Sequence, residues 1–266
     1  MLLQDKTAVI YGAAGAVGSA VARTFAREGA KVFLAGRTLE TLDTLAAEIS
    51  AEGGETDVAQ VDALDRQAVQ EHADAVVEEA GSIDVSFNAI GIDHVQGTPL
   101  RELSPEDYSL PITTYTTTQF LTATAAARYM VSRGSGVILT LSATAARVTL
   151  PSDGFGVACA GVEAFSRQLA GELGPYGVRV VCLRPDAIPE TAMLGSHART
   201  VWSRAAERMG MTLEDVLDGS PGVPGPLLQR SPSLAEVADV AAFMASDRAS
   251  AMTASVANIS CGSVVD

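Results

Sequence analysis

The chain has 266 residues, of which 47% are hydrophobic and 19% are charged, which is enough for one large domain with a full hydrophobic core. This composition excludes a disordered tail and a fibrous repeat. The formal net charge of −14 makes a surface that repels nucleic acids and anionic lipids. We therefore expect a single domain over residues 1–266 that binds a small molecule, with neither nucleic acid nor membrane as a partner.

The cysteines and the first residues indicate the compartment. Cys159, Cys182 and Cys261 form no CxxC pair, and their odd number leaves one unpaired in any disulfide scheme. The start of the chain, MLLQDKTAVIYGA, has no basic segment followed by a long apolar run, and no uncharged apolar stretch of about 18 residues exists anywhere. We expect a cytoplasmic protein that spans no membrane. No metal site is predicted.

Short apolar or β-branched runs alternate with amphipathic stretches of helical length. The first strand is predicted at Thr7–Tyr11, and the first helix runs from about Val17 to Glu28 and ends at Gly29. Further strands are predicted at Lys31–Ala35, Thr56–Val61, Ile83–Ile90, Gly136–Leu141 and Val178–Leu183, and further helices at Leu39–Ala51, Arg66–Ala80, Pro105–Arg133 and Gly156–Leu173. Pro111 is expected to break or kink the long helix.

This alternation predicts parallel strands joined by right-handed crossovers, with helices on both faces of one sheet. The predicted fold class is therefore α/β, a single-domain doubly wound parallel sheet of the Rossmann-like kind. Residues 187–232 depart from the rhythm, because Thr191–Met211 is predicted as one helix and Gly219–Pro232 is rich in glycine and proline. We expect a helical lid here, after the sixth strand. A helix at Ser233–Ser246 and a strand at Ser255–Ile259 complete the fold.

The turn between the first strand and the first helix is rich in small residues. Gly12, Gly15 and Gly18 spell GxxGxxG, with Val17 at the start of the helix. A helix N-terminus offers unpaired N–H groups and the positive end of its dipole to a pyrophosphate. Gly12 would permit the tight turn, and Gly18 the close packing of helix on strand. Because the turn opens a βαβ unit, these residues predict dinucleotide binding; the alternative is an ordinary turn rich in alanine and glycine.

The residue after the second strand indicates which dinucleotide is bound. Dinucleotide-binding folds read the adenosine ribose about 20 residues past the glycines, with an acid for NAD or an arginine for NADP. Arg37 stands there, and positions 36 and 37 hold no carboxylate. A guanidinium can bind a 2′-phosphate through several donors. Arg37 therefore predicts NADP(H), and the alternative is a solvated surface arginine.

From about residue 5 to residue 262, the chain resembles the short-chain dehydrogenase/reductase family. The glycine-rich turn resembles the family's TGxxxGxG, and residues 84–91, DVSFNAIG, resemble DxxVNNAG. Val61-Asp62 resembles the pair whose carboxylate meets the adenine. The resemblance implies that Asp62, Asn88 and Gly91 help to bind the cofactor. It also implies a homodimer or homotetramer.

The family's catalytic pair, YxxxK, is not found. In the family, the tyrosine hydroxyl passes a proton to or from the substrate, and the lysine lowers the pKa of that tyrosine and holds the nicotinamide ribose. Alignment puts Phe155 at the tyrosine and Cys159 at the lysine. Phenylalanine has no exchangeable proton, and a thiol is mostly neutral at pH 7. The only lysines, Lys6 and Lys31, belong to the nucleotide-binding half, so no substitute ammonium is expected.

Two polar residues remain as catalytic candidates. Tyr115 aligns with the family's catalytic asparagine and is the best available phenol; the alternative is a packing tyrosine. Ser142 lies thirteen residues before Phe155, which is the spacing of the family's serine, whereas strand register puts Ala143 at that position. Because side chains alternate along a strand, both orientations of Ser142 stay open.

Four other polar residues, His94, Asp153, Arg184 and Asp186, fall near the carboxyl ends of predicted strands, where such sheets bind ligands. His94 titrates in the range that acid–base work needs, and the alternative is a solvated loop histidine.

The lid carries apolar residues, among them Met193, Leu194 and Trp202, that would enclose an apolar ligand. The sequence therefore predicts an atypical NADP(H)-binding enzyme acting on a small, largely apolar substrate. Its proton delivery would be non-standard, as in reduction of a C=C bond or an imine, or in a non-redox step, and alcohol or ketone turnover would be weak or absent. The alternative is a catalytically inactive dinucleotide-binding sensor or complex subunit.

Overall fold

The alternation in the sequence is realised as one parallel sheet. The computed structural model describes residues 1–149, 153–194, 196–218 and 225–265. Seven strands pair in the order β3-β2-β1-β4-β5-β6-β7, and the pairs are parallel. The strands are β1 (Thr7–Tyr11), β2 (Lys31–Gly36), β3 (Glu55–Gln60), β4 (Val85–Asn88), β5 (Gly136–Leu141), β6 (Val178–Pro185) and β7 (Ser255–Ile259). This topology confirms the doubly wound α/β fold.

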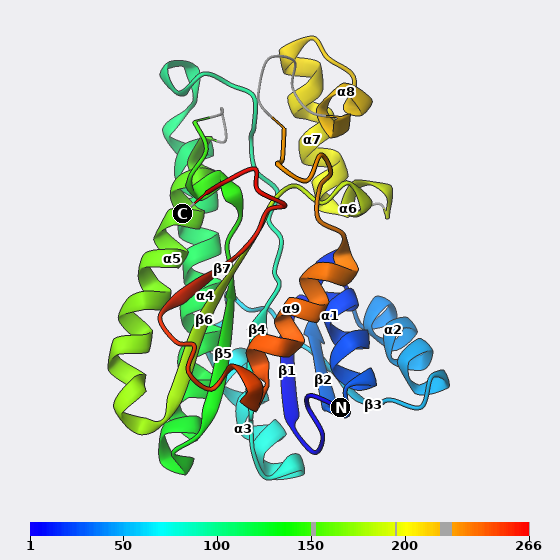
Figure 1. Cartoon of the computed structure of the whole chain (residues 1–266), viewed down its shortest axis with the longest axis vertical. Helices are drawn as coiled ribbons and strands as arrows, with labels where there is room; N and C mark the ends of the chain where they lie inside the picture. The colour runs from blue at the N-terminus through cyan, green and yellow to red at the C-terminus, as the bar shows by residue number, and fades with distance from the viewer. Residues whose placement is uncertain (150–152, 195, 219–224, 266) are drawn as a thin grey trace.

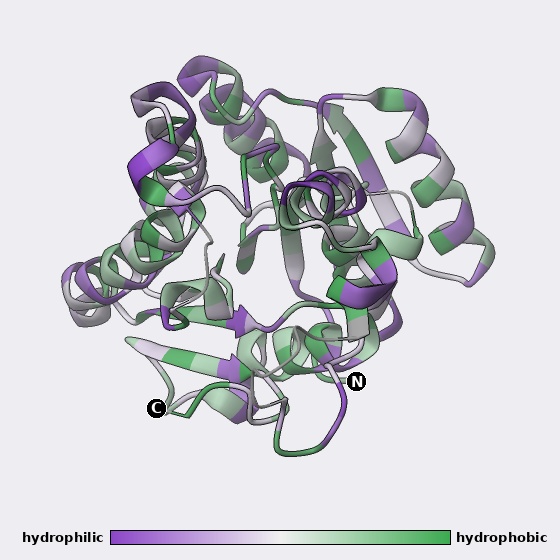
Figure 2. Cartoon of the chain, turned by 90° about the horizontal axis from the view of Figure 1, so that it is seen from above, coloured by the Kyte–Doolittle hydropathy of each residue, from purple (hydrophilic) through white to green (hydrophobic). Residues whose placement is uncertain are grey.

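Helices cover both faces of the sheet (Figure 1). One layer consists of α1 (Ala16–Arg27), α2 (Leu39–Ala51) and α9 (Leu234–Ala245), and the other of α3 (Arg66–Ala80), α4 (Pro105–Arg133) and α5 (Asp153–Leu173). Successive residues of each strand supply the two cores in turn, because side chains alternate across a strand. In the view from above, the helices flank the sheet and carry the hydrophilic residues on their outer sides (Figure 2).

The long helix α4 is continuous through Pro111, so the predicted break is wrong. Ser104 caps its start by accepting the N–H of Asp107 at 3.0 Å, and Gly134 ends it in the left-handed conformation. Pro111 lies in the second turn, so the helix gives up the bond that an N–H there would make to the carbonyl of Asp107 and still continues. The start of α5 also supports this stretch, because a Cβ on Gly154 would lie 2.9 Å from Cγ of Pro111.

The lid follows β6, as predicted, but it is not one long helix over 191–211. It forms α6 (Pro189–Met193), α7 (His197–Met209) and α8 (Leu213–Asp218). Ser196 caps a new helix start by accepting the N–H of Ala198, and Gly210 ends that helix with φ of +69°. Residues 219–224, which belong to the glycine- and proline-rich stretch of the predicted lid, lie outside the described residues. The lid helices lie together at the top of Figure 1, beyond the carboxyl ends of the strands.

No helix in the described part of the chain is both long enough and apolar enough to cross a membrane.

Candidate functional site

The glycine-rich turn packs so closely that two of its glycines have no room for a side chain. Gly12 has φ of +73°, and a Cβ there would lie 2.9 Å from the backbone of Ile90. A Cβ on Gly18 would lie 2.3 Å from the carbonyl oxygen of Gly12. Gly15 is the N-cap of α1 and provides no side-chain cap, and the first turn of the helix, where Val17 packs against the core, holds no acid. The N–H groups at this helix start are therefore suited to a pyrophosphate.

The residues predicted to read the adenosine end lie on neighbouring strands. Arg37 follows β2 and Asp62 follows β3, whose ends are joined by the Gly36–Gln60 pair. Arg37 is exposed, and no described residue accepts a hydrogen bond from its guanidinium. Asp62 is also exposed, and its Oδ1 accepts the N–H of Leu64 at 3.0 Å. The guanidinium is thus available to a phosphate at the edge of the predicted adenosine pocket.

The turn after β4 is fixed to the sheet and touched by the lid. Asn88 is buried, donates from Nδ2 to Oγ1 of Thr122 at 3.0 Å and accepts the N–H of Ile90 at Oδ1. Gly91 lies under the ring of His197, the first residue of α7, since a Cβ on Gly91 would lie 1.8 Å from Cε1 of that ring. The lid therefore contacts the turn that is predicted to bind the cofactor.

Four positions that the sequence resemblance aligns with the family's catalytic residues, with Ala143 as one of the two alternatives for the serine, gather in one apolar cluster. Phe155, Cys159, Tyr115 and Ala143 pack with neighbours such as Ile92, Ala158, Val162 and Cys182. The Phe155 ring lies 4.3 Å from the His94 ring, centroid to centroid and nearly parallel, and 5.7 Å from the Tyr115 ring. Burial raises the pKa of the Cys159 thiol far above its ordinary value, so this thiol is neutral. No proton relay runs between Phe155 and Cys159, one turn apart on α5.

The hydroxyl of Tyr115 has a structural partner. It donates to the carbonyl oxygen of Leu141 at 2.8 Å, and the residue is 3% exposed. Burial raises the pKa of the phenol well above its ordinary value. A proton-donor role for Tyr115 stays a prediction, and both the bond and the burial weigh against it.

Ser142 faces a buried carboxylate. Its Oγ donates to Oε1 of Glu163 at 3.0 Å, and Arg184 donates to the same oxygen at 3.3 Å. Ser142 is 2% exposed, whereas Ala143 packs in the cluster with Phe155. This register places Ala143, and not Ser142, in the cluster with Phe155, the position that the resemblance aligns with the family's tyrosine. A catalytic role for Ser142 stays a prediction.

Three of the other polar candidates lie near the carboxyl ends of the strands and differ in their hydrogen bonds and pKa values. His94 is buried, donates from Nδ1 to the carbonyl oxygen of Ile92 at 3.0 Å and accepts Nε2–H of Gln96 at 2.9 Å, and burial lowers its pKa to about 4. Burial raises the pKa of the Asp153 carboxyl to about 6. Oδ1 of Asp186 accepts Oγ1–H of Thr144 at 2.6 Å. His94 is therefore a neutral ring with both nitrogens in use.

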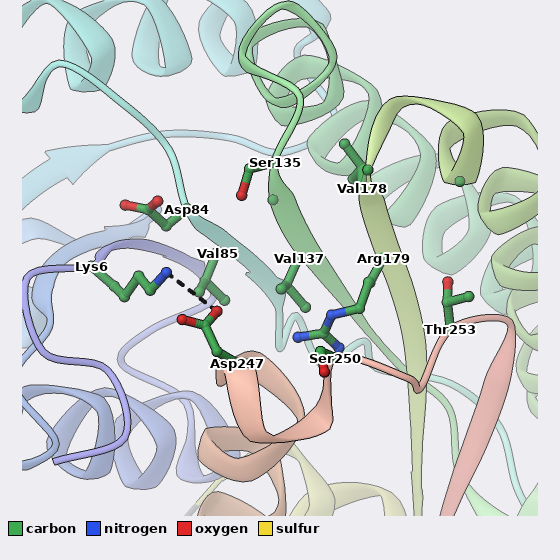
Figure 3. A pocket seen from close by; sticks show the side chains of 14 residues that line it. Lys6, Asp84, Val85, Ser135, Val137, Val178, Arg179, Asp247, Ser250 and Thr253 are labelled. Atoms are coloured by element: carbon green, nitrogen blue, oxygen red, sulfur yellow. Dashed lines mark hydrogen bonds and ion pairs between the residues drawn. The ribbon is translucent and has the colours of Figure 1, made fainter.

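Both lysines lie at the opposite, amino edge of the sheet. Lys6 precedes β1 and pairs with Asp247 at 3.4 Å, beside a cavity of about 370 Å³ (Figure 3). In that cavity the Arg179 guanidinium donates to the carbonyl oxygens of Met244, Ser246 and Met252. These hydrogen bonds attach β6 to the end of α9 and to the segment that follows it. Lys31 begins β2 and pairs with Glu79 at 2.5 Å. No ammonium group of a described side chain approaches the carboxyl edge.

Sequence reasoning missed His197. The residue is one of three histidines in the chain, and it follows Ser196, which caps α7. The signal in the sequence was a serine at a helix start inside the lid, but the helix was expected to run through this position. Contact with Gly91 depends on how the lid folds back over β4, and no spacing along the chain shows that.

The parallel strand order and the tight glycine turn after β1 are those of the dinucleotide-binding class of doubly wound domains. The model of the short chain dehydrogenase family matches residues 6–202. D-threitol dehydrogenase of Mycolicibacterium smegmatis is 33% identical over 189 residues, which cover 70% of this chain and 71% of that protein. The 2,3-dihydro-2,3-dihydroxybenzoate dehydrogenase of Bacillus subtilis is 29% identical over 257 residues, covering 94% and 93%. The chain belongs to the short-chain dehydrogenase/reductase family.

Solved structures show the same fold. The chain superposes on NAD⁺-bound xylitol dehydrogenase with a TM-score of 0.85 and 24% identity, covering 98% of this chain and 100% of that one. Sorbitol-6-phosphate 2-dehydrogenase SrlD of Erwinia amylovora gives a TM-score of 0.87 with 25% identity, covering 97% and 100%. Proteins of this family are oxidoreductases that bind NAD(P)(H).

Proposed function

We propose that this chain is an atypical NADP(H)-dependent oxidoreductase that acts on a small, largely apolar substrate without the tyrosine–lysine relay of its family. The observation that carries the proposal is the apolar cluster of Phe155, Cys159, Tyr115 and Ala143 at the relay positions. Both lysines lie at the other edge of the sheet. The chain keeps the residues that bind a dinucleotide and lacks those that serve alcohol and ketone chemistry.

The cofactor-binding part of the proposal rests on the two turns and the arginine. Gly12, Gly15 and Gly18 would let the start of α1 approach a pyrophosphate, and Arg37 would bind the 2′-phosphate. Asp62 would meet the adenine, while Asn88 and Gly91 would line the path toward the nicotinamide. Bound NADPH would supply a hydride. The protein's own task is to orient the substrate and to handle the proton.

The absent relay favours some reactions over others. Reduction of a ketone develops alkoxide charge, and the proton donor that meets it contributes about 10²- to 10⁴-fold in rate. An imine nitrogen is basic enough to take its proton from a weak acid before the hydride arrives, and an activated C=C bond spreads the charge over a conjugated group. We therefore propose an imine or an activated alkene as substrate, with weak or absent ketone turnover.

A panel of reactions tests this assignment. Oxidation of NADPH is followed at saturating concentrations of methylpyrroline, cyclohexenone and cyclohexanone. The proposal expects turnover with the imine or the enone and turnover at least about 10²-fold slower with the ketone. Ketone reduction at a comparable rate would contradict it.

A catalytically inactive dinucleotide-binding sensor or complex subunit is the second candidate. The packing of Phe155 between His94 and Tyr115 favours it, because these aromatic rings fill the space where a proton donor would work. Tight NADPH binding with no turnover of any of the three compounds would support this candidate over the first.

Two further proposals concern assembly and location. Phe120 on α4 is half exposed and its ring lies 6.2 Å from that of Phe165 on α5, so we propose that these helices form the contact of a homodimer or homotetramer. The cysteines Cys159, Cys182 and Cys261 are free, which supports a reducing, cytoplasmic location.

A further inference from the structure

The proposed reduction needs a proton source at the carboxyl edge, and three of the groups there are already held by structural contacts. The phenol of Tyr115 is bonded to Leu141 in the core. Both ring nitrogens of His94 are bonded, and the Cys159 thiol is fully buried. Each of these groups would have to break a structural bond or leave its core position to reach a substrate.

His197 occupies a different kind of position. It is the first residue of α7, it is exposed, and no described residue forms a hydrogen bond with its ring. A Cβ on Gly91 would lie 1.8 Å from Cε1, 2.4 Å from Nδ1 and 2.5 Å from Nε2 of this ring. The imidazole therefore takes the space that a side chain at Gly91 would fill, with Cε1 as its atom nearest to the turn that we assign to the cofactor.

The charged neighbours of His197 come from two elements. On the loop after β4, the charge of Asp93 acts on His197, and His197 in turn lowers the pKa of His94. Asp93 is itself paired at 3.0 Å with Arg204 of α7, and Glu190 of α6 is bonded elsewhere, to the N–H of Leu234. Covering of the ring by its neighbours lowers the pKa of His197, and Asp93 raises it in part. The lowered pKa leaves the ring mostly neutral at pH 7, and its imidazolium fraction rises as the pH falls.

We propose that His197 donates the proton in the reduction, in place of the family's tyrosine. This inference rests on the proposed function. The N–H bond of the imidazolium breaks, and a new bond forms between that proton and the imine nitrogen, or the carbon next to the one that accepts the hydride. The neutral ring then takes a proton from water, because the residue is exposed. Each turnover consumes one NADPH and one proton.

The first test compares His197→Gln with the wild-type protein, using methylpyrroline and cyclohexenone as probes. With a histidine donor, the wild-type kcat rises as the pH falls from about 8 to about 6. His197→Gln should lower kcat by about 10²-fold or more, and abolish this pH dependence, while KM and the Kd for NADPH stay within about 3-fold. Thr200→Gln, an exposed position on the same helix, is the matched control and should behave as wild type.

The outcomes separate the two proposals. If the wild-type protein reduces a probe and His197→Gln keeps both kcat and the pH profile, the inference about His197 is overturned and the proposed function stands. If the wild-type protein binds NADPH but turns over no probe, the proposed function fails.

A second measurement needs no turnover. The chain has three histidines, so their Cε1 proton resonances can be assigned by comparing the wild-type protein with His197→Gln. We expect the His197 resonance to move, and its titration midpoint to rise, when NADP⁺ is added, since the negative phosphates would come to lie near the ring. If saturating NADP⁺ changes neither the chemical shift nor the titration midpoint of the His197 resonance, the inference is overturned whatever the activity.

Discussion

Replacement of Arg37 by alanine tests the cofactor assignment most directly. Its guanidinium is exposed and has no acceptor among the described residues, so the side chain contributes nothing to the fold that would be lost with it. A charge-assisted hydrogen bond contributes about 1.5–3 kcal/mol. Because solvent screens an exposed site, we take about 1.5–2 kcal/mol, which corresponds to about a 10- to 30-fold weaker binding of NADPH. NADH lacks the 2′-phosphate and should bind with unchanged affinity.

The assay is fluorescence titration of NADPH and NADH against the wild-type protein, Arg37→Ala and Arg37→Asp. Arg37→Asp should reverse the preference, because a carboxylate repels the phosphate and accepts hydrogen bonds from the free ribose hydroxyls of NADH. Arg248→Ala, an exposed arginine after α9, is the control and should change neither affinity. The reasoning is refuted if Arg37→Ala weakens both cofactors equally, or if the wild-type protein prefers NADH.

Phe155→Tyr combined with Cys159→Lys restores the family's pair, and it should raise ketone reduction by about 10²- to 10⁴-fold; an unchanged rate in a folded double variant would show that the alignment is wrong. Tyr115→Phe removes a buried hydrogen bond and should lower the free energy of unfolding by about 1–2 kcal/mol without changing kcat, as thermal unfolding and steady-state kinetics will show; a large loss of kcat would instead assign the phenol to the chemistry. His72 and His94 have pKa values lowered to about 4 by burial, below the ordinary value of about 6.5, so the unfolded state binds more protons between these values. The stability they provide is therefore complete above about pH 6.5 and is lost as the pH falls toward 4, by about 3 kcal/mol for each ring; urea unfolding that is equally difficult at both ends of this range would contradict the assignment.

The fold was predictable because its signals are local. The strand β1 begins and ends as predicted, since an apolar run of this length between two turns is too short for a helix and is typical of a buried strand. The long helix was placed correctly at both ends, because Ser104 and Gly134 are strong capping residues. Of the two alternatives predicted at Pro111, the break is wrong, since the start of α5 packs against this stretch from far along the chain.

The sequence predicted the placement of the glycine turn and Arg37, whereas the placement of the other candidate residues depended on tertiary contacts. The positions of Gly12, Gly18 and Arg37 follow from the order of strands and helices, so spacing alone placed them at one edge. The orientation of Ser142 depends on a shift of one residue, and its partner Glu163 lies on another element. The contact between His197 and Gly91 arises from the folding of the lid over the sheet, which leaves no periodic pattern in the sequence.

The distribution of lysines has a practical consequence for handling the protein. Lys6 and Lys31 carry all the side-chain amines of the chain, and both lie at the amino edge. Coupling through these amines to a sensor chip or a resin would attach the molecule by one end, with the lid and the turns predicted to bind the nucleotide directed into solution. An immobilised preparation made in this way should keep its full binding capacity, and fluorescent labels on the same amines would report from the end remote from the ligand.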